Sequence, residues 1–257
     1  TIINSLIQAG YSKANAQSAL SRALGYSTQV EITHYDPIKA AGEGDDDAEK
    51  ILKAGAMVIN LMRQAEAYSA TVFSFETGEV GLAVAKQLGY AAMVIDSNLS
   101  SNLYYDNFIF AVLDSALNDV NASFDHDEDS LAHVAAIVSA SNAAFDLINV
   151  TELSSAQTAV QLAKVQLAVE VFILNKYEDV RNGTYSLTSL ANSVSAESLI
   201  SLGDSFVGVN LYSPFGKSFD LRIDQADWVE GKVLTTLFVS DADGDTVTVN
   251  ISAGNND

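Results

Sequence analysis

The sequence predicts a mainly α protein: a multi-helix bundle over residues 1–203, followed by a short β segment over residues 204–257. Two observations predict this division. Apolar residues recur at three- and four-residue steps up to about residue 203, which is the spacing of one face of an α-helix. Beyond that point apolar and polar residues alternate, which is the period of a half-buried strand.

Helical spacing in the N-terminal part predicts four helices, over residues 2–9, 13–24, 77–88 and 104–119. The stretch YDPIKAAG predicts a turn into a short helix that begins at Pro37, because proline is well tolerated at the first helical position. Short polar stretches separate these segments, so we expect them to pack as neighbours in one bundle.

Two acidic runs each precede an apolar helical stripe. Asp45, Asp46 and Asp47 precede a stripe made of Ile51, Ala54, Val58, Met62 and Ala65. The run from Asp125 to Asp129 precedes a stripe made of Leu131, Val134, Val138, Phe145 and Ile148. Carboxylates at a helix start accept hydrogen bonds from free N–H groups and meet the positive end of the helix dipole. We therefore expect capped helices first and metal sites second.

Two histidines, His126 and His133, flank the start of this second helix. They lie on opposite sides of the helix start, which places them poorly as a pair of metal ligands. We expect both to be solvated surface residues.

Apolar residues occupy both faces of the window 155–177. One face carries Val160, Leu167, Val171 and Leu174, and the other carries Leu162, Val165, Val169 and Phe172. A helix that is apolar all round must be surrounded by others, so we expect the central helix here, with Val165 and Leu167 in the core. Its most apolar stretch, AVQLAKVQLAVEVFIL, contains two charged residues and is shorter than the roughly 20 residues of a membrane span. We expect no transmembrane segment.

The C-terminal part reads as strands joined by an acidic loop. The stretches SFDLRID and TVTVNIS alternate apolar and polar residues, and VLTTLFVS between them is β-branched and apolar. The segment DADGD joins the last two strands and is typical of a loop.

Three carboxylates, Asp241, Asp243 and Asp245, crowd this loop. Such a cluster is repulsive unless solvent, a capping role or a cation offsets it, and calcium takes several oxygen ligands from clusters of this kind. An EF-hand loop is excluded, because it requires glycine at the sixth position and glutamate at the twelfth. Counted from Asp241, the glycine is fourth and the twelfth residue is Ser252.

The run WVEGKVLTTLFVSDADGDTVTVNISAGNND resembles the opening of a cadherin-like repeat, as found in tandem in large bacterial surface proteins and adhesins. This resemblance implies a partial β-sandwich and a calcium site at the junction between repeats. Glu230 matches the acidic residue of the first strand, and Asp241 and Asp243 match the Asp-x-Asp pair. Asp245 is added to the calcium ligands by proximity.

The helical part, from ALGYSTQVEITHYDPIKAA to AKVQLAVEVFI, is similar to an α-helical module of large secreted bacterial proteins. In those proteins the module accompanies cadherin-like, dockerin-like and RTX-type calcium-binding repeats. The resemblance implies secretion or a cell-surface location, and it implies no catalytic residues.

The amino-acid composition excludes several classes of function. The chain has 13 basic and 33 acidic residues, a formal net charge of −20 and no cysteine. Phosphate binding needs clustered Lys and Arg, so nucleic acid is excluded as a partner, and thiol catalysis and disulfides are excluded as well. The nucleophile elbow, the zinc-protease helix, the phosphate loop and the dinucleotide fingerprint do not occur.

The sequence therefore predicts a non-enzymatic extracellular protein with a structural or assembly role, which binds calcium and joins copies of itself into a filament or lattice. Other repeats of a larger surface protein are the alternative partners. An adhesin segment that binds a surface glycan or protein is the second hypothesis. A secreted hydrolase that uses paired carboxylates is the third, since 33 acidic residues bring some pairs together by chance.

Overall fold

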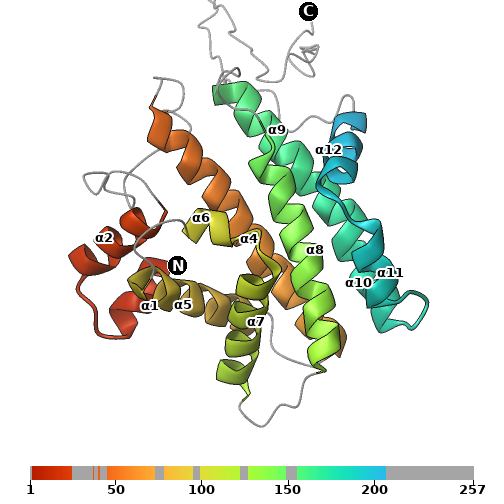
Figure 1. The fold of residues 1–257 in the computed structure, drawn as a ribbon, viewed down its shortest axis with the longest axis horizontal. Helices are drawn as coiled ribbons and strands as arrows, with labels where there is room; N and C mark the ends of the chain where they lie inside the picture. The colour runs from red at the N-terminus through yellow and green to blue at the C-terminus, as the bar shows by residue number, and fades with distance from the viewer. Residues whose placement is uncertain are drawn as a thin grey trace, which may run out of the picture. The chain divides into compact units, whose positions relative to one another are not determined.

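The computed structural model describes residues 2–24, 37, 40, 45–72, 78–94, 99–121, 127–148 and 155–206. These residues are mainly helical and include no β-strand (Figure 1), which confirms the mainly α class. The short helix expected at Pro37 lies outside the described residues except for positions 37 and 40. The expected β segment also lies outside them, except that the last helix reaches Ser205, just past the boundary expected at residue 203.

The helices are, in chain order, α1 (Ile2–Gln8), α2 (Lys13–Ala23), α4 (Asp46–Val72), α5 (Glu79–Val94), α6 (Leu99–Asn102), α7 (Asp106–Val120), α8 (Glu128–Asp146), α9 (Ser155–Ala168), the π-helix η1 (Val169–Leu174), α10 (Asn175–Arg181), α11 (Leu187–Ser193) and α12 (Ala196–Ser205). The helices expected over 2–9, 13–24 and 104–119 are confirmed as α1, α2 and α7. The helix expected over 77–88 is confirmed as α5, which continues to Val94.

Helices α4 and α8 are the central pair of the bundle. Helix α4 packs against α5, α8, α9 and α10, and α8 also packs against α7, α9, α11 and α12. Figure 1 shows α4 and α8 side by side, with α9 and α12 beyond α8. The stripe expected on α8, from Leu131 to Ile148, is buried as predicted.

The stripe expected on α4 is only partly correct. Its most deeply buried large side chains are Met57, Leu61 and Tyr68, whereas Val58 and Met62 are only partly buried. The buried face also carries Asn60 and Gln64. A prediction from hydrophobicity places those two polar residues on the solvent face. The predicted buried face of α4 is therefore turned about the helix axis relative to the observed one.

A second, smaller core joins α1 and α2 to the C-terminal end of α5. Its members include Ile3, Leu6, Leu20 and Ala92. Gly89 on α5 lets α1 come close, because a Cβ at that position would lie 3.0 Å from Cγ of Leu6. The N-terminal helices are therefore fixed to α5 by packing.

Side-chain caps start α4 and α8, as the two acidic runs predict. The Asp45 carboxylate accepts a hydrogen bond from the Asp47 N–H at 2.9 Å. At α8 the Asp127 carboxylate accepts from the Ser130 hydroxyl at 2.6 Å and from the Ser130 N–H at 3.2 Å. The hydrogen bond from the Ser130 hydroxyl is the main reason why the pKa of Asp127 is lowered, so this cap is ionised at neutral pH.

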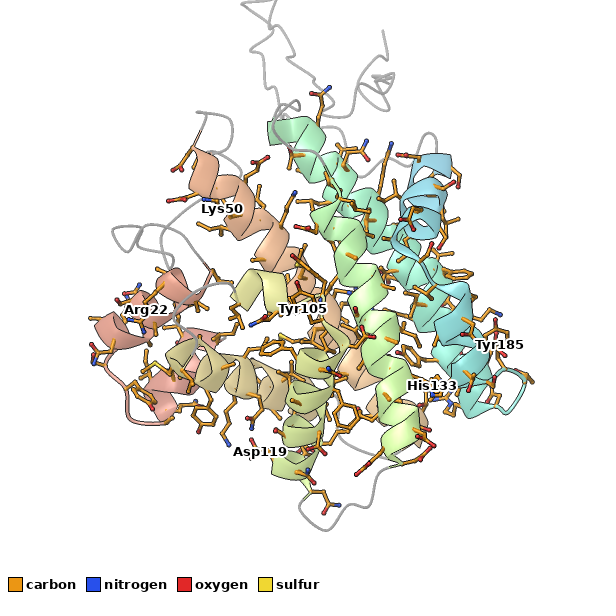
Figure 2. The ribbon with its side chains drawn as sticks, in the orientation of Figure 1. Arg22, Lys50, Tyr105, Asp119, His133 and Tyr185 are labelled. Carbon is orange, nitrogen blue, oxygen red and sulfur yellow. The ribbon has the colours of Figure 1, made fainter. Side chains whose placement is uncertain are left out.

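Of the two histidines near this cap, His126 lies outside the described residues. His133 is partly exposed near the start of α8 (Figure 2), where its Nδ1 lies 2.6 Å from the Asp129 carbonyl oxygen. That backbone contact is local to the helix.

The expectation of a central helix over 155–177, covered on both faces, is only partly correct. Val165 and Val169 are buried, but Leu167, Phe172 and Leu174 are only partly buried, and Val171 is 45 % exposed. Among the described residues, helices α4, α8 and α12 contact this region, and the face with Leu167, Val171 and Leu174 is less covered than the face with Val165 and Val169. The chain also passes through η1, and a π-turn shifts the phase of the residues that follow it. Apolar residues on both faces of a helix therefore do not show that other helices cover both faces.

One helix of the described part, Gln157–Arg181, is long and apolar enough to cross a membrane by length and composition alone. Its 25 residues exceed the apolar stretch identified from sequence, because α9, η1 and α10 run on without a break. Core helices of soluble proteins pass the same test, so the absence of a transmembrane segment stays a prediction.

A matched pair of substitutions tests this correction. Val165→Ala should lower the free energy of unfolding by about 1.5–3 kcal/mol, because it removes buried methyl groups. Val171→Ala makes the same chemical change on the exposed face and should stay within about 0.5 kcal/mol of the parent. Urea denaturation followed by circular dichroism measures both, and equal losses would contradict the one-sided burial of this helix.

Candidate functional site

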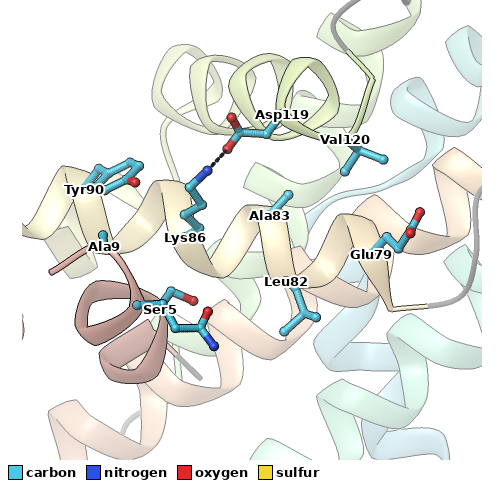
Figure 3. A pocket seen from close by; sticks show the side chains of 10 residues that line it. Ser5, Ala9, Glu79, Leu82, Ala83, Lys86, Tyr90, Asp119 and Val120 are labelled. Carbon is cyan, nitrogen blue, oxygen red and sulfur yellow. Dashed lines mark hydrogen bonds and ion pairs between the residues drawn. The ribbon is translucent and has the colours of Figure 1, made fainter.

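An open groove of about 670 Å³ runs along α5, and we call it the α5 groove (Figure 3). Helix α5 supplies its floor with Glu79, Leu82, Ala83, Lys86 and Tyr90. These positions follow helical spacing, so they lie on one face of α5. Helix α1 forms one wall and the C-terminal end of α7 forms the other.

Lys86 is the central charged group of the α5 groove. Its ammonium lies 2.9 Å from Oδ2 of Asp119, on the end of α7 (Figure 3), and 5.7 Å from the centre of the Tyr90 ring. The Gln87 amide donates to the same Asp119 oxygen at 2.6 Å. The hydrogen bond to Asp119 raises the pKa of Lys86. A lysine that acts as a general base needs a lowered pKa, so Lys86 is suited to hydrogen bonding and not to proton abstraction.

The α5 groove also exposes hydrocarbon. Leu82 is 58 % exposed on its floor, and Ala9 and Val120 line the two walls. A volume of this size falls within the roughly 300–1,000 Å³ of ligand pockets, which combine apolar surface with a few placed polar groups. The geometry fits a ligand that lies along the surface.

A second, smaller hollow of about 260 Å³ lies between α2 and the end of α5. Tyr11, Asn15, Arg22 and Met93 are among its lining residues. It is below the size range of ligand pockets, roughly 300 Å³ and above, so the α5 groove is the stronger candidate site.

The most concentrated polar chemistry of the described residues is buried between α4 and α8. The Asn60 amide donates to Oγ of Ser141 at 2.9 Å and to Oδ1 of Asn142 at 2.8 Å. The Gln64 amide donates to Oδ1 of Asn60 at 2.9 Å and to Oγ of Ser141 at 2.7 Å. We call these four residues the polar seam.

Further contacts tie the polar seam to other elements. The Asn142 amide donates to the carbonyl of Leu103, between α6 and α7, at 2.5 Å, and the Tyr177 hydroxyl of α10 lies 3.5 Å from Oε1 of Gln64. All four seam residues are buried. Their polar groups form hydrogen bonds with other groups of the protein, so the polar seam has a structural role.

Two buried phenols lie in the same core. Burial, with a smaller effect of the Asp127 charge, raises the pKa of Tyr68 to about 12, and burial also raises the pKa of Tyr177. Both hydroxyls therefore stay protonated at neutral pH, where they act as hydrogen-bond partners.

The calcium ligands predicted from sequence, Glu230, Asp241, Asp243 and Asp245, lie outside the described residues. Within the described ranges, no three His, Asp or Glu side chains gather closely enough to hold a metal ion. Asp45 and Asp127, at the starts of α4 and α8, act as helix caps instead.

Sequence reasoning found neither the α5 groove nor the polar seam. A signal for the seam existed in Asn60 and Gln64, one helical turn apart and on the same face as Leu61 and Tyr68. No comparable signal marks the α5 groove, because its floor and walls come from three separate parts of the chain.

No protein family, no curated protein and no solved structure matches this chain. The similarity to the helical modules and cadherin-like repeats of secreted calcium-binding proteins therefore stays a prediction.

Proposed function

We propose that this chain is a non-enzymatic structural or assembly protein of a bacterial cell surface or extracellular matrix. The observation that carries the proposal is the carboxylate cluster Asp241, Asp243 and Asp245, with Glu230 upstream, in a chain of net charge −20. A chain this acidic repels its own copies unless cations screen the charge. In this proposal calcium offsets the charge of the cluster itself, where another chain must approach, and so favours joining of chains.

In this proposal the two parts of the chain have different roles. The helical part, residues 1–203, serves as the scaffold, and buried hydrogen bonds join its helices α4 and α8. The β segment, residues 204–257, is the part that joins other chains. A short sheet with open edges is marginal in water and pairs readily with a further strand, and strand addition is a known mode of recognition between chains.

Repeating that contact head to tail gives a filament or lattice, since such an interface propagates unless its rotation closes a ring. A neighbouring copy supplies the missing strands in the self-assembling form. The alternative partners are further repeats of a larger surface protein, in which case the same strands come from the same polypeptide.

Three groups of the described part have pKa values that do not suit general acid–base catalysis at neutral pH. Lys86, the cation of the α5 groove, has a raised pKa because Asp119 holds it, and burial raises the pKa values of Tyr68 and Tyr177. Catalytic acids and bases are instead tuned toward the working pH. A hydrolase that uses paired carboxylates is the least supported alternative.

Adhesion is the second candidate function, and the α5 groove is the observation that favours it. The groove combines exposed hydrocarbon with polar groups on a face of the helical part. An adhesive segment would use this groove to hold a surface glycan or protein, while the C-terminal segment anchors the chain.

Calcium binding is tested by thermal melting. Ions that bind only the folded state raise its stability by mass action, so the melting temperature of the parent should rise in millimolar calcium relative to chelator. Asp243→Ala should remove most of that rise. The control variant Asp146→Ala removes an exposed carboxylate at the end of α8 and should keep the full rise. A melting temperature of the parent that is identical in calcium and chelator would contradict the calcium site.

Self-assembly is tested by light scattering across a range of protein concentrations in calcium. The full chain should grow in mean size with concentration, and a chain that lacks residues 233–257 should stay monomeric, because the strands that pair with a neighbour are gone. Chelator should reverse the growth of the full chain. A full chain that stays monomeric at every concentration, as the truncated one does, removes the assembly hypothesis.

A further inference from the structure

The α5 groove has the length of an extended ligand. Glu79 and Tyr90 stand at the two ends of its floor. They are 90 − 79 = 11 residues apart on one helix, which is ~16 Å at a rise of about 1.5 Å per residue. Figure 3 shows α1 and α7 on opposite sides of this floor. The groove therefore suits a chain-like molecule lying along α5.

The lining of the α5 groove excludes a purely apolar occupant. Its polar groups are of both kinds: amide and ammonium donors from Gln8 and Lys86, and carboxylate acceptors from Glu79 and Asp119. An apolar ligand would take these groups out of water without giving them hydrogen bonds, which is unfavourable for every one of them. The occupant must itself carry donors and acceptors along its length.

The charges of the α5 groove disfavour an anionic occupant, and the ion pair between Lys86 and Asp119 limits how a cationic one can bind. Glu79, Asp119 and Lys86 sum to −1 − 1 + 1 = −1, and the whole chain carries −20, so anions are repelled. Oδ2 of Asp119 already accepts from Lys86 at 2.9 Å and from Gln87 at 2.6 Å. At Asp119 a cationic ligand would have to compete with both donors, and Glu79 is the other carboxylate that it could reach. A neutral ligand can form hydrogen bonds with both carboxylates and leave the ion pair intact, so a cationic probe is the decisive comparison.

The α5 groove also offers apolar surface to a ligand, from an aromatic and an aliphatic side chain. Leu82 is exposed on the floor. Tyr90 lies at one end of the floor and is partly exposed, with the Lys86 ammonium over one face of its ring, so only the rest of its ring is open to a ligand. The C–H faces of sugar rings pack on such aromatic and aliphatic groups, while their hydroxyls both donate and accept hydrogen bonds. We propose that the α5 groove binds a neutral oligosaccharide, with its rings against Tyr90 and Leu82 and its hydroxyls on Gln8, Glu79 and Asp119.

This inference rests on the adhesive alternative under the proposed function and is independent of calcium assembly. The α5 groove belongs to the helical part, whereas the predicted calcium ligands lie beyond it in the sequence. Sugar binding should therefore be the same in calcium and in chelator. If calcium assembly fails, the sugar titration should be unchanged. If sugar binding fails, assembly in calcium should be unchanged.

Calorimetric titration of the full chain tests the site, with cellotetraose, maltotetraose and xylotetraose as neutral probes. Tetragalacturonate and trilysine are the anionic and cationic comparisons. We expect at least one neutral tetrasaccharide to bind with one-to-one stoichiometry, more tightly than either charged probe. Combining Gln8→Ala with Leu82→Ala changes two exposed side chains and should weaken that binding by about tenfold.

The matched control is Val94→Ala, at the end of the same helix, where the side chain is 82 % exposed and does not line the groove. Its affinity should stay within about twofold of the parent, and circular dichroism checks that each variant is folded. The proposal is overturned if no neutral tetrasaccharide binds, or if trilysine binds more tightly than all of them. It is also overturned if the folded double variant binds as well as the parent, since the sugar site would then lie elsewhere.

Discussion

The buried hydrogen bonds of the polar seam constrain how the central helices of this protein can pack. Asn60 and Gln64 on α4 meet Ser141 and Asn142 on α8 at distances of 2.7–2.9 Å. A buried amide that loses its partner costs more than a mismatched pair of methyl groups, because it has given up water and gained nothing. Sliding α4 along α8 by one turn would leave several of these groups without partners, so one register is selected.

The other elements depend on that register. Asn142 reaches the Leu103 carbonyl between α6 and α7, and Tyr177 brings α10 to Gln64. Glycines on α5 and α12 then permit close approach, as at Gly203, where a Cβ would lie 3.0 Å from the Lys164 backbone oxygen. With α5 held on α4 and α7, and α1 held on α5, both walls of the α5 groove are placed by the core. Packing of the core, and not a bound ligand, therefore determines the shape of the α5 groove.

Sequence patterns predicted the elements well and their environments less well. The apolar stripe of α8 agrees with the structure, because large apolar residues on both sides of Ser141 and Asn142 mark its buried face. On α4, Asn60 and Gln64 lie inside the buried face, and their burial depends on partners 77 to 82 residues away. The apolar composition of the helix through Val165 and Val171 predicts a central position, because local composition indicates apolar surface but not what covers it. The α5 groove could not be predicted, since it exists only when α1, α5 and α7 come together.

A double-mutant cycle on Asn60 and Asn142 tests the role of the polar seam most directly. The free energies of unfolding of Asn60→Ala, Asn142→Ala and the double variant are measured by urea denaturation and compared with the parent. If the seam fixes the central pair, the two substitutions should be coupled by at least about 1 kcal/mol, with the double variant losing less than the sum of the single losses. Strictly additive losses would mean that the two side chains act independently, and would contradict a central constraint built from their hydrogen bond.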